Sequence, residues 1–184
     1  QNGEFNAAYG EQLFENGSTI TQQQAGSFNN THASQSIGAG PSQALQQQEG
    51  NGNFSFVYQD SQDGASGTTF QQGDNNTAYV EQMVMGIGNN ATVIQFGNTN
   101  YSAAEQVFQV AGQINTFQSG NDNYAYGDQR NGEGGSVTIN QGGEFNGTEV
   151  WQETQVSSHA TINQSGQANE TVVDQSFGQE NLAT

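Results

Sequence analysis

The chain has 184 residues, of which 18 are acidic and 1 is basic, and its formal net charge is −17 at pH 7. A single Arg cannot neutralise a row of phosphates, which argues against nucleic-acid binding, and the lack of Cys excludes disulfides and thiol chemistry. No apolar run approaches the roughly 18 residues of a membrane-spanning helix, so we expect no membrane insertion. The first residues lack the basic and apolar regions of a signal peptide, and we expect any such peptide to have been removed.

The composition alone is typical of a disordered chain, because Leu, Ile, Val and Phe supply only 32 of the 184 residues. Gln and Asn supply 50 residues, however, and they recur in a fixed pattern. The pattern Q-x-G-x-x-N-x-[AST]-x-x-x-Q occurs eight times, at intervals of 23 or 24 residues. The repeats begin at residues 1, 24, 48, 71, 95, 118, 141 and 164. This regularity predicts one repeating structural domain over residues 1–184.

Four positions are the same in every repeat. The leading Gln is Gln1, Gln24, Gln48, Gln71, Gln95, Gln118, Gln141 and Gln164. The Gly two residues later is Gly3, Gly26, Gly50, Gly73, Gly97, Gly120, Gly143 and Gly166. The Asn five residues after the leading Gln is Asn6, Asn29, Asn53, Asn76, Asn100, Asn123, Asn146 and Asn169. The closing Gln, eleven residues after the leading one, is Gln12, Gln35, Gln59, Gln82, Gln106, Gln129, Gln152 and Gln175.

Each repeat reads as two short strands joined by an arc. The first strand ends at the leading Gln, and the second runs from the Asn to the closing Gln with the alternation of a β-strand. The invariant Gly between them suits a tight arc because Gly can adopt a positive φ. A second, looser arc follows the closing Gln and can hold the extra residue of the two longer repeats, near Pro41 and near Gly86 to Gly88. A helical repeat is disfavoured by the 25 Gly.

The fold class that follows is all-β: a two-sheet β-solenoid in which each strand–arc–strand unit, here called a rung, stacks on the next. We expect parallel pairing with rungs about 4.8 Å apart, as in cross-β structures, so that eight rungs span roughly 38 Å. The predicted inward residues of the first strand include Ile20, Ala44, Ala91, Val93, Ile114, Val137, Ile139, Ala160 and Ile162. Those of the second strand include Gly10, Ala33, Val57, Val80, Ala104, Gly127, Val150 and Val173.

The Gln and Asn columns are predicted to be ladders in which each amide bonds to the same residue in the neighbouring rungs. A buried amide without partners costs about 1–3 kcal/mol, so a ladder requires the same residue in every rung. The sequence meets this requirement in all three amide columns.

The Gln and Asn spacing resembles that of the curlins, the secreted subunits of bacterial curli amyloid, whose repeat is S-x5-Q-x4-N-x5-Q. The Q, N and Q positions match in all eight repeats. The leading Ser slot is kept at Ser18, Ser42 and Ser158 but holds Ala65, Asn89, Gly112 and Gly135 elsewhere. The resemblance implies export in an unfolded state and assembly into extracellular fibres at the bacterial cell surface. Its implied partners are further copies of the chain, a nucleator subunit, and secretion and chaperone machinery.

Within that family the minor nucleator subunit tends to carry basic residues in a terminal repeat. This chain has none there, so it is similar to a major, fibre-building subunit.

The ends of the chain suggest how copies join. The chain begins at a leading Gln, and residues 176–184 follow the eighth closing Gln as a partial ninth rung. We expect the tail (Asn181, Leu182, Ala183 and Thr184) and the Gln1 end of the next copy to complete one shared rung, because both ends expose open sheet edges.

Acidic residues often occupy the slot before the closing Gln: Glu11, Glu81, Glu105, Asp128 and Asp174. Outward carboxylates stacked about 4.8 Å apart should repel, which raises their pKa and predicts faster assembly in mild acid or added salt. The alternative is a solvated face that keeps fibres apart.

Outward aromatic residues are either lateral contacts between fibres or ordinary strand formers: Tyr9, Phe56, Tyr79 and Tyr126 in one slot, Phe70 and Phe117 in another.

We expect no catalytic, cofactor-binding or metal-binding residues. His32 and His159 lie in outward slots of different strands, and no pattern of a nucleophilic or calcium-binding site is present. The N-x-[ST] sequences at Asn29, Asn53, Asn100, Asn146 and Asn169 follow from the repeat itself, and a glycan there would block the rung.

The expected function is therefore structural: an amyloid subunit that grows by templated strand addition at open solenoid ends. Two alternatives belong to other classes. One is a soluble ice-binding or polysaccharide-binding solenoid; ice binding would need a flat, regular outward array, commonly of Thr, and the outward slots vary. A polysaccharide-cleaving β-helix would need three-sided rungs, caps and a cleft.

Overall fold

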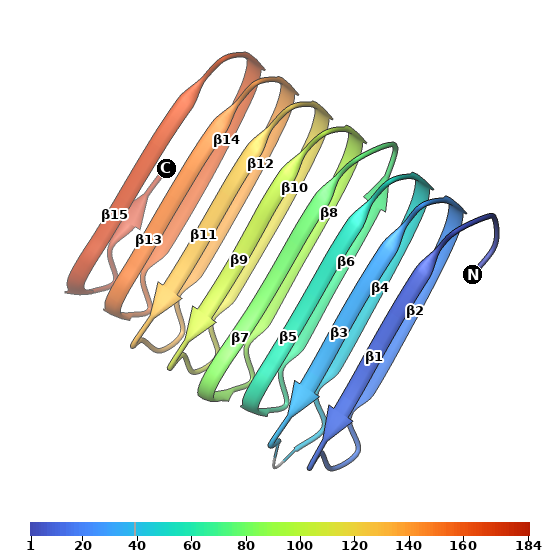
Figure 1. Cartoon of the computed structure of the whole chain (residues 1–184). Coiled ribbons are helices and arrows are strands. Elements are labelled where there is room, and N and C mark those ends of the chain that lie inside the picture. Colours follow the sequence, from blue (N-terminus) through green and yellow to red (C-terminus); the bar gives the residue numbers. More distant parts are fainter. Residues whose placement is uncertain (39) are drawn as a thin grey trace.

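The computed structural model describes residues 1–38 and 40–184, and within them all sixteen regular elements are β-strands. The strands form two parallel sheets that face each other along the whole length of the molecule, and the chain alternates between the sheets at each arc (Figure 1). The architecture is thus the two-sheet β-solenoid that the repeat predicts, and the fold-class prediction is confirmed.

The odd-numbered strands form sheet B in chain order. They are β1 (Ala7–Leu13), β3 (Asn30–Ser36), β5 (Phe54–Asp63), β7 (Thr77–Ile87), β9 (Tyr101–Val107), β11 (Tyr124–Arg130), β13 (Gly147–Val156) and β15 (Glu170–Gln179). The even-numbered strands form sheet A. They are β2 (Thr19–Ser27), β4 (Gln43–Asn51), β6 (Ser66–Gln72), β8 (Asn90–Asn98), β10 (Gln113–Asn121), β12 (Ser136–Glu144), β14 (His159–Gln167) and β16 (Leu182–Ala183).

Neighbouring strands pair in the register of the repeat, so that each repeat position lies opposite itself. Gln118 of β10 pairs with Gln95 of β8 and Gln141 of β12, for example. The register shifts once, where Asp60 and Gln62 of β5 face Met83 and Gly86 of β7. Val84 and Met85 both have a positive φ there and accommodate the extra residue of that repeat. The extra residue expected near Pro41 falls on a stretch that includes residue 39, which lies outside the described residues.

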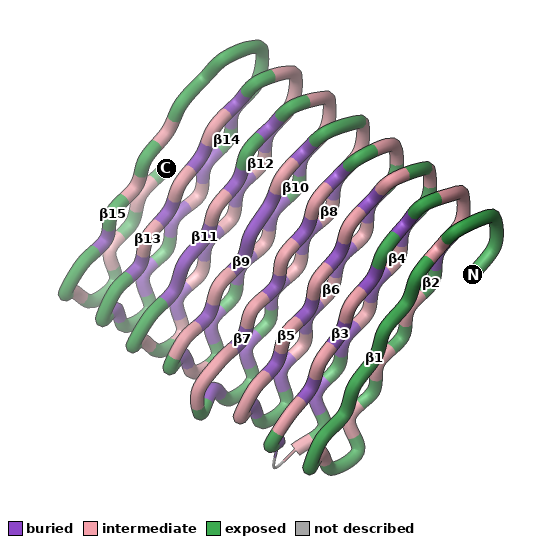
Figure 2. The backbone as a smooth tube through the Cα atoms, viewed as in Figure 1, coloured by how far each residue is buried: buried purple, intermediate pink, exposed green. Residues whose placement is uncertain are grey.

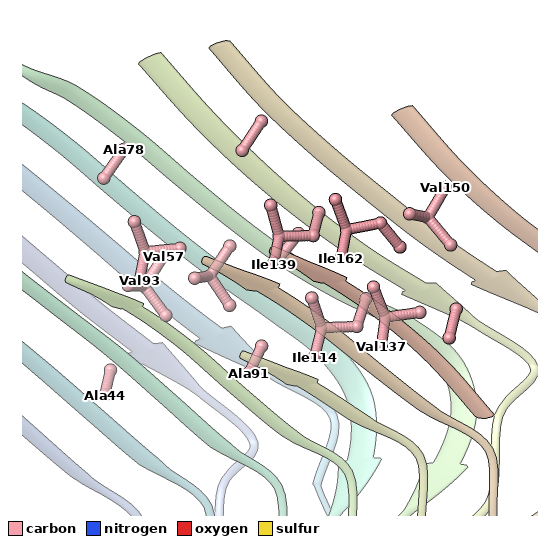
Figure 3. Close-up of a cluster of buried hydrophobic side chains, with 14 of the residues drawn as sticks. Ala44, Val57, Ala78, Ala91, Val93, Ile114, Val137, Ile139, Val150 and Ile162 are labelled. Atoms are coloured by element: carbon pink, nitrogen blue, oxygen red, sulfur yellow. The ribbon is translucent and has the colours of Figure 1, made fainter. Parts of the chain in front are cut away.

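The core is a thin layer of small and β-branched side chains between the sheets (Figure 3). Its fully buried members include Val57, Val93, Ile114 and Ile139. Buried residues alternate with half-buried or exposed ones along most strands, because one face of each sheet packs inward and the other faces solvent (Figure 2). β1 is exposed along its whole length, Gly10 included, because it is an edge strand whose own rung contributes only residues 1–3 on the opposite side.

The invariant Gly of the first arc is required for two reasons. Its φ lies between +99° and +123° in all eight repeats. The backbone also passes so close to the neighbouring rung that a Cβ on Gly97 would overlap the carbonyl group of Gly120. The residue before each Asn has a positive φ as well, although it is Gly only at Gly52 and Phe at Phe5, Phe28 and Phe145. Sequence reasoning missed this second position because its residue type varies.

Candidate functional site

The leading Gln residues form one continuous ladder of hydrogen bonds. Each side-chain Nε2 donates to the Oε1 of the leading Gln in the following rung, from Gln1 through to Gln164, at 2.8–3.1 Å. From Gln24 onward the same nitrogen also donates to a backbone carbonyl of sheet B, as in the 3.0 Å bond from Gln95 to Thr77. The ladder therefore links rungs along the axis and links the two sheets across the core.

The closing Gln residues form a second ladder in the same direction. Gln12 to Gln175 are connected by seven Nε2 to Oε1 hydrogen bonds of 2.7–2.9 Å. From Gln35 to Gln152 these side chains are at most 3% exposed, so their amides are shielded from water. Loss of one member would leave a buried donor and a buried acceptor unpaired.

The Asn column forms a ladder that runs in the opposite direction. From Asn53 to Asn169, each Nδ2 donates to the Oδ1 of the preceding Asn at 2.8–3.2 Å. The Oδ1 also accepts the backbone N–H of the following Asn. From Asn6 to Asn146 each Nδ2 also donates to the carbonyl of the arc Gly in the next rung. The Asn side chains thus hold the arc of one rung against the arc of the next.

Three further polar columns were not predicted from the sequence. At the leading Ser slot, Ser18, Ser42, Asn89 and Ser158 accept the backbone N–H of the same slot in the next rung. In the first arc, Asn51, Asp74, Asn98 and Asn121 accept the backbone N–H of the same slot in the preceding rung. In the core, Gln22 donates to Gln46, and Gln46 donates to Ser55. The residue type at these positions changes between rungs, so a search for the same residue in every repeat does not reveal these columns.

The two outer faces differ in charge. Sheet B carries ten acidic residues and Arg130, whereas sheet A carries only Glu49, Glu144 and His159. The acidic residues of sheet B are Glu11, Asp60, Asp63, Glu81, Glu105, Asp128, Glu149, Glu153, Glu170 and Asp174. Most of the negative charge of the strands is therefore on one side of the solenoid, and the other side is nearly neutral.

The acidic slot is less uniform than the sequence suggested. Burial, and to a smaller extent the charge of Glu105, raise the pKa of Glu81. Asp128 is 3% exposed, and Arg130 covers it with Nε to carboxylate distances of 2.7 and 2.9 Å. A nitrogen of the same guanidinium lies 3.3 Å from Glu105. The prediction that outward carboxylates repel one another along this slot is wrong at this rung, because Arg130, the one basic side chain, bridges the carboxylates of Asp128 and Glu105.

Aromatic rings form a continuous stripe on the outer face of sheet B. Contacts run from Tyr9 to His32, Phe56, Tyr79, Tyr101 and Tyr124, with ring centroids 4.8–6.0 Å apart. Burial is the main cause that raises the pKa of Tyr101 and Tyr124. The stripe changes slot at Ala103, where no ring is available. On sheet A, Phe70, Phe96 and Phe117 form a shorter series.

The remaining predicted residues are placed as follows. His32 belongs to the aromatic stripe, and the Nδ1 of His159 lies 2.6 Å from the Oγ of Ser136. The Asn residues of the N-x-[ST] sequences are buried in the Asn ladder except Asn169.

At the chain ends, Leu182 and Ala183 pair with His159 and Ala160 of β14, and Asn2 pairs with Ala25. Residues 1–38 and 40–184 include no helix long and apolar enough to span a membrane.

Comparison with known proteins identifies the repeat. Residues 63–97 match the family model of the curlin associated repeat, which covers the segment from β6 to β8. No curated protein and no solved structure matches the chain. The matched segment contains the leading Gln, the arc Gly, the Asn and the closing Gln whose spacing recurs in every rung. The resemblance read from these columns is thereby confirmed, and residues 63–97 are similar to a curlin associated repeat.

Proposed function

We propose that this protein is a secreted structural subunit that assembles with further copies of itself into extracellular, curli-like amyloid fibres of a bacterial biofilm matrix. The observation that carries the proposal is the equivalence of the rungs: every rung presents the same Gln, Asn and Gln columns in the same register. A rung of a second copy would therefore extend the ladders of the first by the contacts that already join neighbouring rungs.

The ladder ends within the described residues illustrate this growth mechanism. Gln12 donates to Gln35, and its Oε1 has no hydrogen-bond donor among the described residues. At the other end, Gln175 accepts from Gln152 and uses one N–H for the carbonyl of His159. The second N–H of Gln175 in one copy would donate to Gln12 in the next, and the edges of β15 and β1 would pair in parallel.

The tail and the head would share the rung at such a junction. Leu182 pairs opposite His159, at the start of the first strand, whereas residues 1–3 lie opposite the end of β2 and its arc. The two segments thus occupy different parts of the rung. By repeat position, Thr184 falls in the column of Thr161 and Gln1 in the column of Gln164.

Partners and location follow from the family resemblance. A nucleator subunit would supply the first template, and secretion and chaperone machinery would deliver the chain unfolded. We propose no catalytic activity, because the conserved positions of the repeat are taken up by the ladders, the arc and the core.

Assembly of the purified, denaturant-released chain tests the proposal. We expect fibres that bind thioflavin, give a reflection near 4.8 Å along the fibre axis, and are seeded by their own fragments. Gln106→Ala, which breaks the closing-Gln ladder in the middle, should assemble more slowly than the unmodified chain under the same conditions. A stable β-rich monomer that never elongates on seeds would exclude the proposed function.

A second candidate is a soluble ice-binding or polysaccharide-binding solenoid. One observation favours it: the nearly neutral face of sheet A carries an outward column with Thr21, Thr68, Thr92, Thr138 and Thr161. The column is interrupted by Leu45 and Asn115, which weakens the regularity that ice binding requires. Thermal hysteresis, or retention on an insoluble neutral polysaccharide, by a chain that remains monomeric would favour this second function.

A further inference from the structure

A large side chain and a glycine alternate along the second arc. The position that follows the closing Gln by three residues, or by four in the rung of β7, has one occupant in each rung. In chain order these are Glu15, Gly38, Gln62, Gly86, Gln109, Gly132, Gln155 and Gly178. The alternation is unbroken through all eight rungs. This position therefore repeats every two rungs, whereas the ladders repeat every rung.

Three of the four large side chains are buried, and those of Glu15, Gln62 and Gln109 lie against the glycine of the following rung. Gln62, Gln109 and Gln155 are each 2% exposed. A Cβ on Gly86 would overlap the Oε1 of Gln62, and a Cβ on Gly132 would lie 2.6 Å from the carbonyl oxygen of Gln155 and 2.8 Å from the Oε1 of Gln109. We call the buried side chain the knob and the glycine that leaves room for it the socket. The knob of the preceding rung fills the space of a side chain at Gly86, and at Gly132 the knob and the backbone of the following rung fill it together.

An Asn three residues after the socket completes the contact in two of the pairs. The Nδ2 of Asn89 donates to the Oε1 of Gln62 at 3.2 Å, and the Nδ2 of Asn181 donates to the Oε1 of Gln155 at 2.9 Å. In the third pair Gly135 stands in the place of this Asn, and the buried Oε1 of Gln109 has no hydrogen-bond partner among the described residues. The polar contact thus joins a knob rung to the socket rung that follows it.

We propose that the structural unit of the solenoid is a doublet of rungs, a knob rung followed by a socket rung, and that a second copy of this chain adds only in the phase that sets knob against socket. A stack displaced by one rung would still match every Gln and Asn ladder. It would, however, set two knobs or two glycines against each other in the second arc. The ladders hold neighbouring rungs together without distinguishing the two phases, and the second arc distinguishes them.

The first test compares two Gly→Gln variants of the full chain. Gly132→Gln places a third knob between Gln109 and Gln155, where overpacking is expected to lower the folding equilibrium constant about tenfold or more. Gly147→Gln is the matched control, because a Cβ on Gly147 meets nothing within 4 Å. The triple variant Gln109→Gly, Gly132→Gln, Gln155→Gly moves the knob by one rung and should recover the part of the loss that the side chains of Gln109 and Gln155 cause, because the backbone carbonyl of residue 155 remains in place. Denaturant unfolding of the folded chain provides the readout.

The second test removes one rung or two. Deletion of residues 109–131 joins Phe108 to Gly132 and sets the sockets Gly86 and Gly132 in neighbouring rungs. Deletion of residues 109–154 joins Phe108 to Gln155 and restores the alternation. If rungs were independent, the larger deletion would be the more harmful, because stability in a solenoid is roughly the sum over its repeats. The doublet predicts the reverse order, both in denaturant midpoint and in the rate of elongation on seeds of the unmodified chain.

The elongation measurement rests on the proposed function, whereas the unfolding measurement does not. If the unmodified chain forms no fibres, the proposed function fails and the midpoints still decide the doublet. The doublet is wrong if Gly132→Gln is as stable as Gly147→Gln, or if losing residues 109–131 costs less than losing 109–154. If the denaturant midpoints show the order that the doublet predicts but the elongation rates do not, the doublet stabilises the single chain and does not select the phase in which a second copy adds.

Discussion

The side-chain nitrogen of Gln95 lies 2.9 Å from the Oε1 of Gln118 in the next rung and 3.0 Å from the carbonyl oxygen of Thr77 in the opposite sheet. The Oε1 of Gln95 accepts a bond of the same kind from Gln71. One fully buried side chain thus joins three rungs of one sheet and both sheets. In a core with so few large apolar side chains, such amides are structural elements of the fold.

Replacement of Gln95 by Ala should therefore be strongly destabilising. The change removes the acceptor of the Gln71 Nε2 and the donor to the Gln118 Oε1, and it opens a cavity. We therefore expect a loss of about 2–5 kcal/mol in the free energy of unfolding. Gln47→Ala is the matched control, because Gln47 makes a ladder bond to Gln23 on the exposed outer face. We expect the control to change stability by less than about 0.5 kcal/mol. Equal effects in denaturant unfolding would contradict the structural role of the buried ladder.

Gly135→Asn should stabilise the protein provided that the closing-Gln ladder shifts by a few tenths of an ångström, because a Cβ at this position would lie 3.0 Å from the Oε1 of Gln152 and 3.1 Å from the Nε2 of Gln129. Asn at this position would supply the donor that Asn89 and Asn181 supply in their doublets, and would pair the buried Oε1 of Gln109. We expect a gain of about 1 kcal/mol, which combines a satisfied buried acceptor with the reduced freedom of the unfolded chain.

The comparison for Gly135→Asn is Gly147→Asn, which removes a glycine in open space without offering a new bond. If both variants raise the thermal midpoint equally, the gain comes from the unfolded chain alone. In that case the account of the orphaned amide is wrong.

Stability should increase on mild acidification, in part through Glu81. Burial and the neighbouring Glu105 raise the pKa of Glu81 in the folded state. The folded chain then binds a proton more tightly than the unfolded chain, so the free energy of unfolding rises as pH falls through the raised pKa. The gain levels off below the unfolded pKa of about 4.3, and at neutral pH the full penalty of the charge remains.

Glu81→Gln removes that penalty and should be more stable than the unmodified chain at pH 7 and similar to it near pH 4. The exposed Glu133→Gln provides the control for loss of one negative charge. Unfolding midpoints of the three chains between pH 4 and pH 8 measure the effect. A Glu81→Gln profile parallel to that of the unmodified chain would show that Glu81 is not a source of the pH dependence.

Arg130→Gln should be destabilising although the Arg130 side chain is 48% exposed. Its loss leaves the carboxylate of Asp128, whose side chain is 4% exposed, without its charged partner. We expect a loss of about 1–3 kcal/mol, smaller than for a fully buried pair because solvent reaches the guanidinium.

The double variant Asp128→Asn, Arg130→Gln should recover much of that loss, since no uncompensated charge then remains. A double variant as unstable as Arg130→Gln would mean that packing of the Arg stem, not its charge, is responsible. Chemical denaturation of the unmodified chain, of the single variants Arg130→Gln and Asp128→Asn, and of the double variant gives the coupling between the two residues.

The period of the sequence was sufficient to predict the fold. Identical residues at intervals of 23 or 24 stack on one another only if each repeat is one rung, and the alternation around Val57 or Val150 distinguishes inward from outward positions. The register of a parallel β-solenoid is set by local repetition, so no long-range contact had to be inferred. The Gln and Asn columns could be read for the same reason.

Other features depended on distances that the sequence does not contain. Arg130 bridges Asp128, two residues away on the same strand, to Glu105, because neighbouring rungs bring residues 25 apart within reach of one side chain. The positive φ at Phe28 or Phe145 is imposed by the path of the arc, against the preference of the residue itself. The bonds between Gln62 and Asn89, and the room left by Gly86, appear only when successive rungs are placed in contact.

The sequence by itself thus determined the rung, its two strands and the columns that stack, because strict repetition leaves few other arrangements that satisfy so many buried amides. Only the tertiary structure decided the direction of each ladder, the charge difference between the two faces and the pairing of rungs into doublets. These properties depend on which side chain fills the space left by another, and that space exists only between rungs that are in contact.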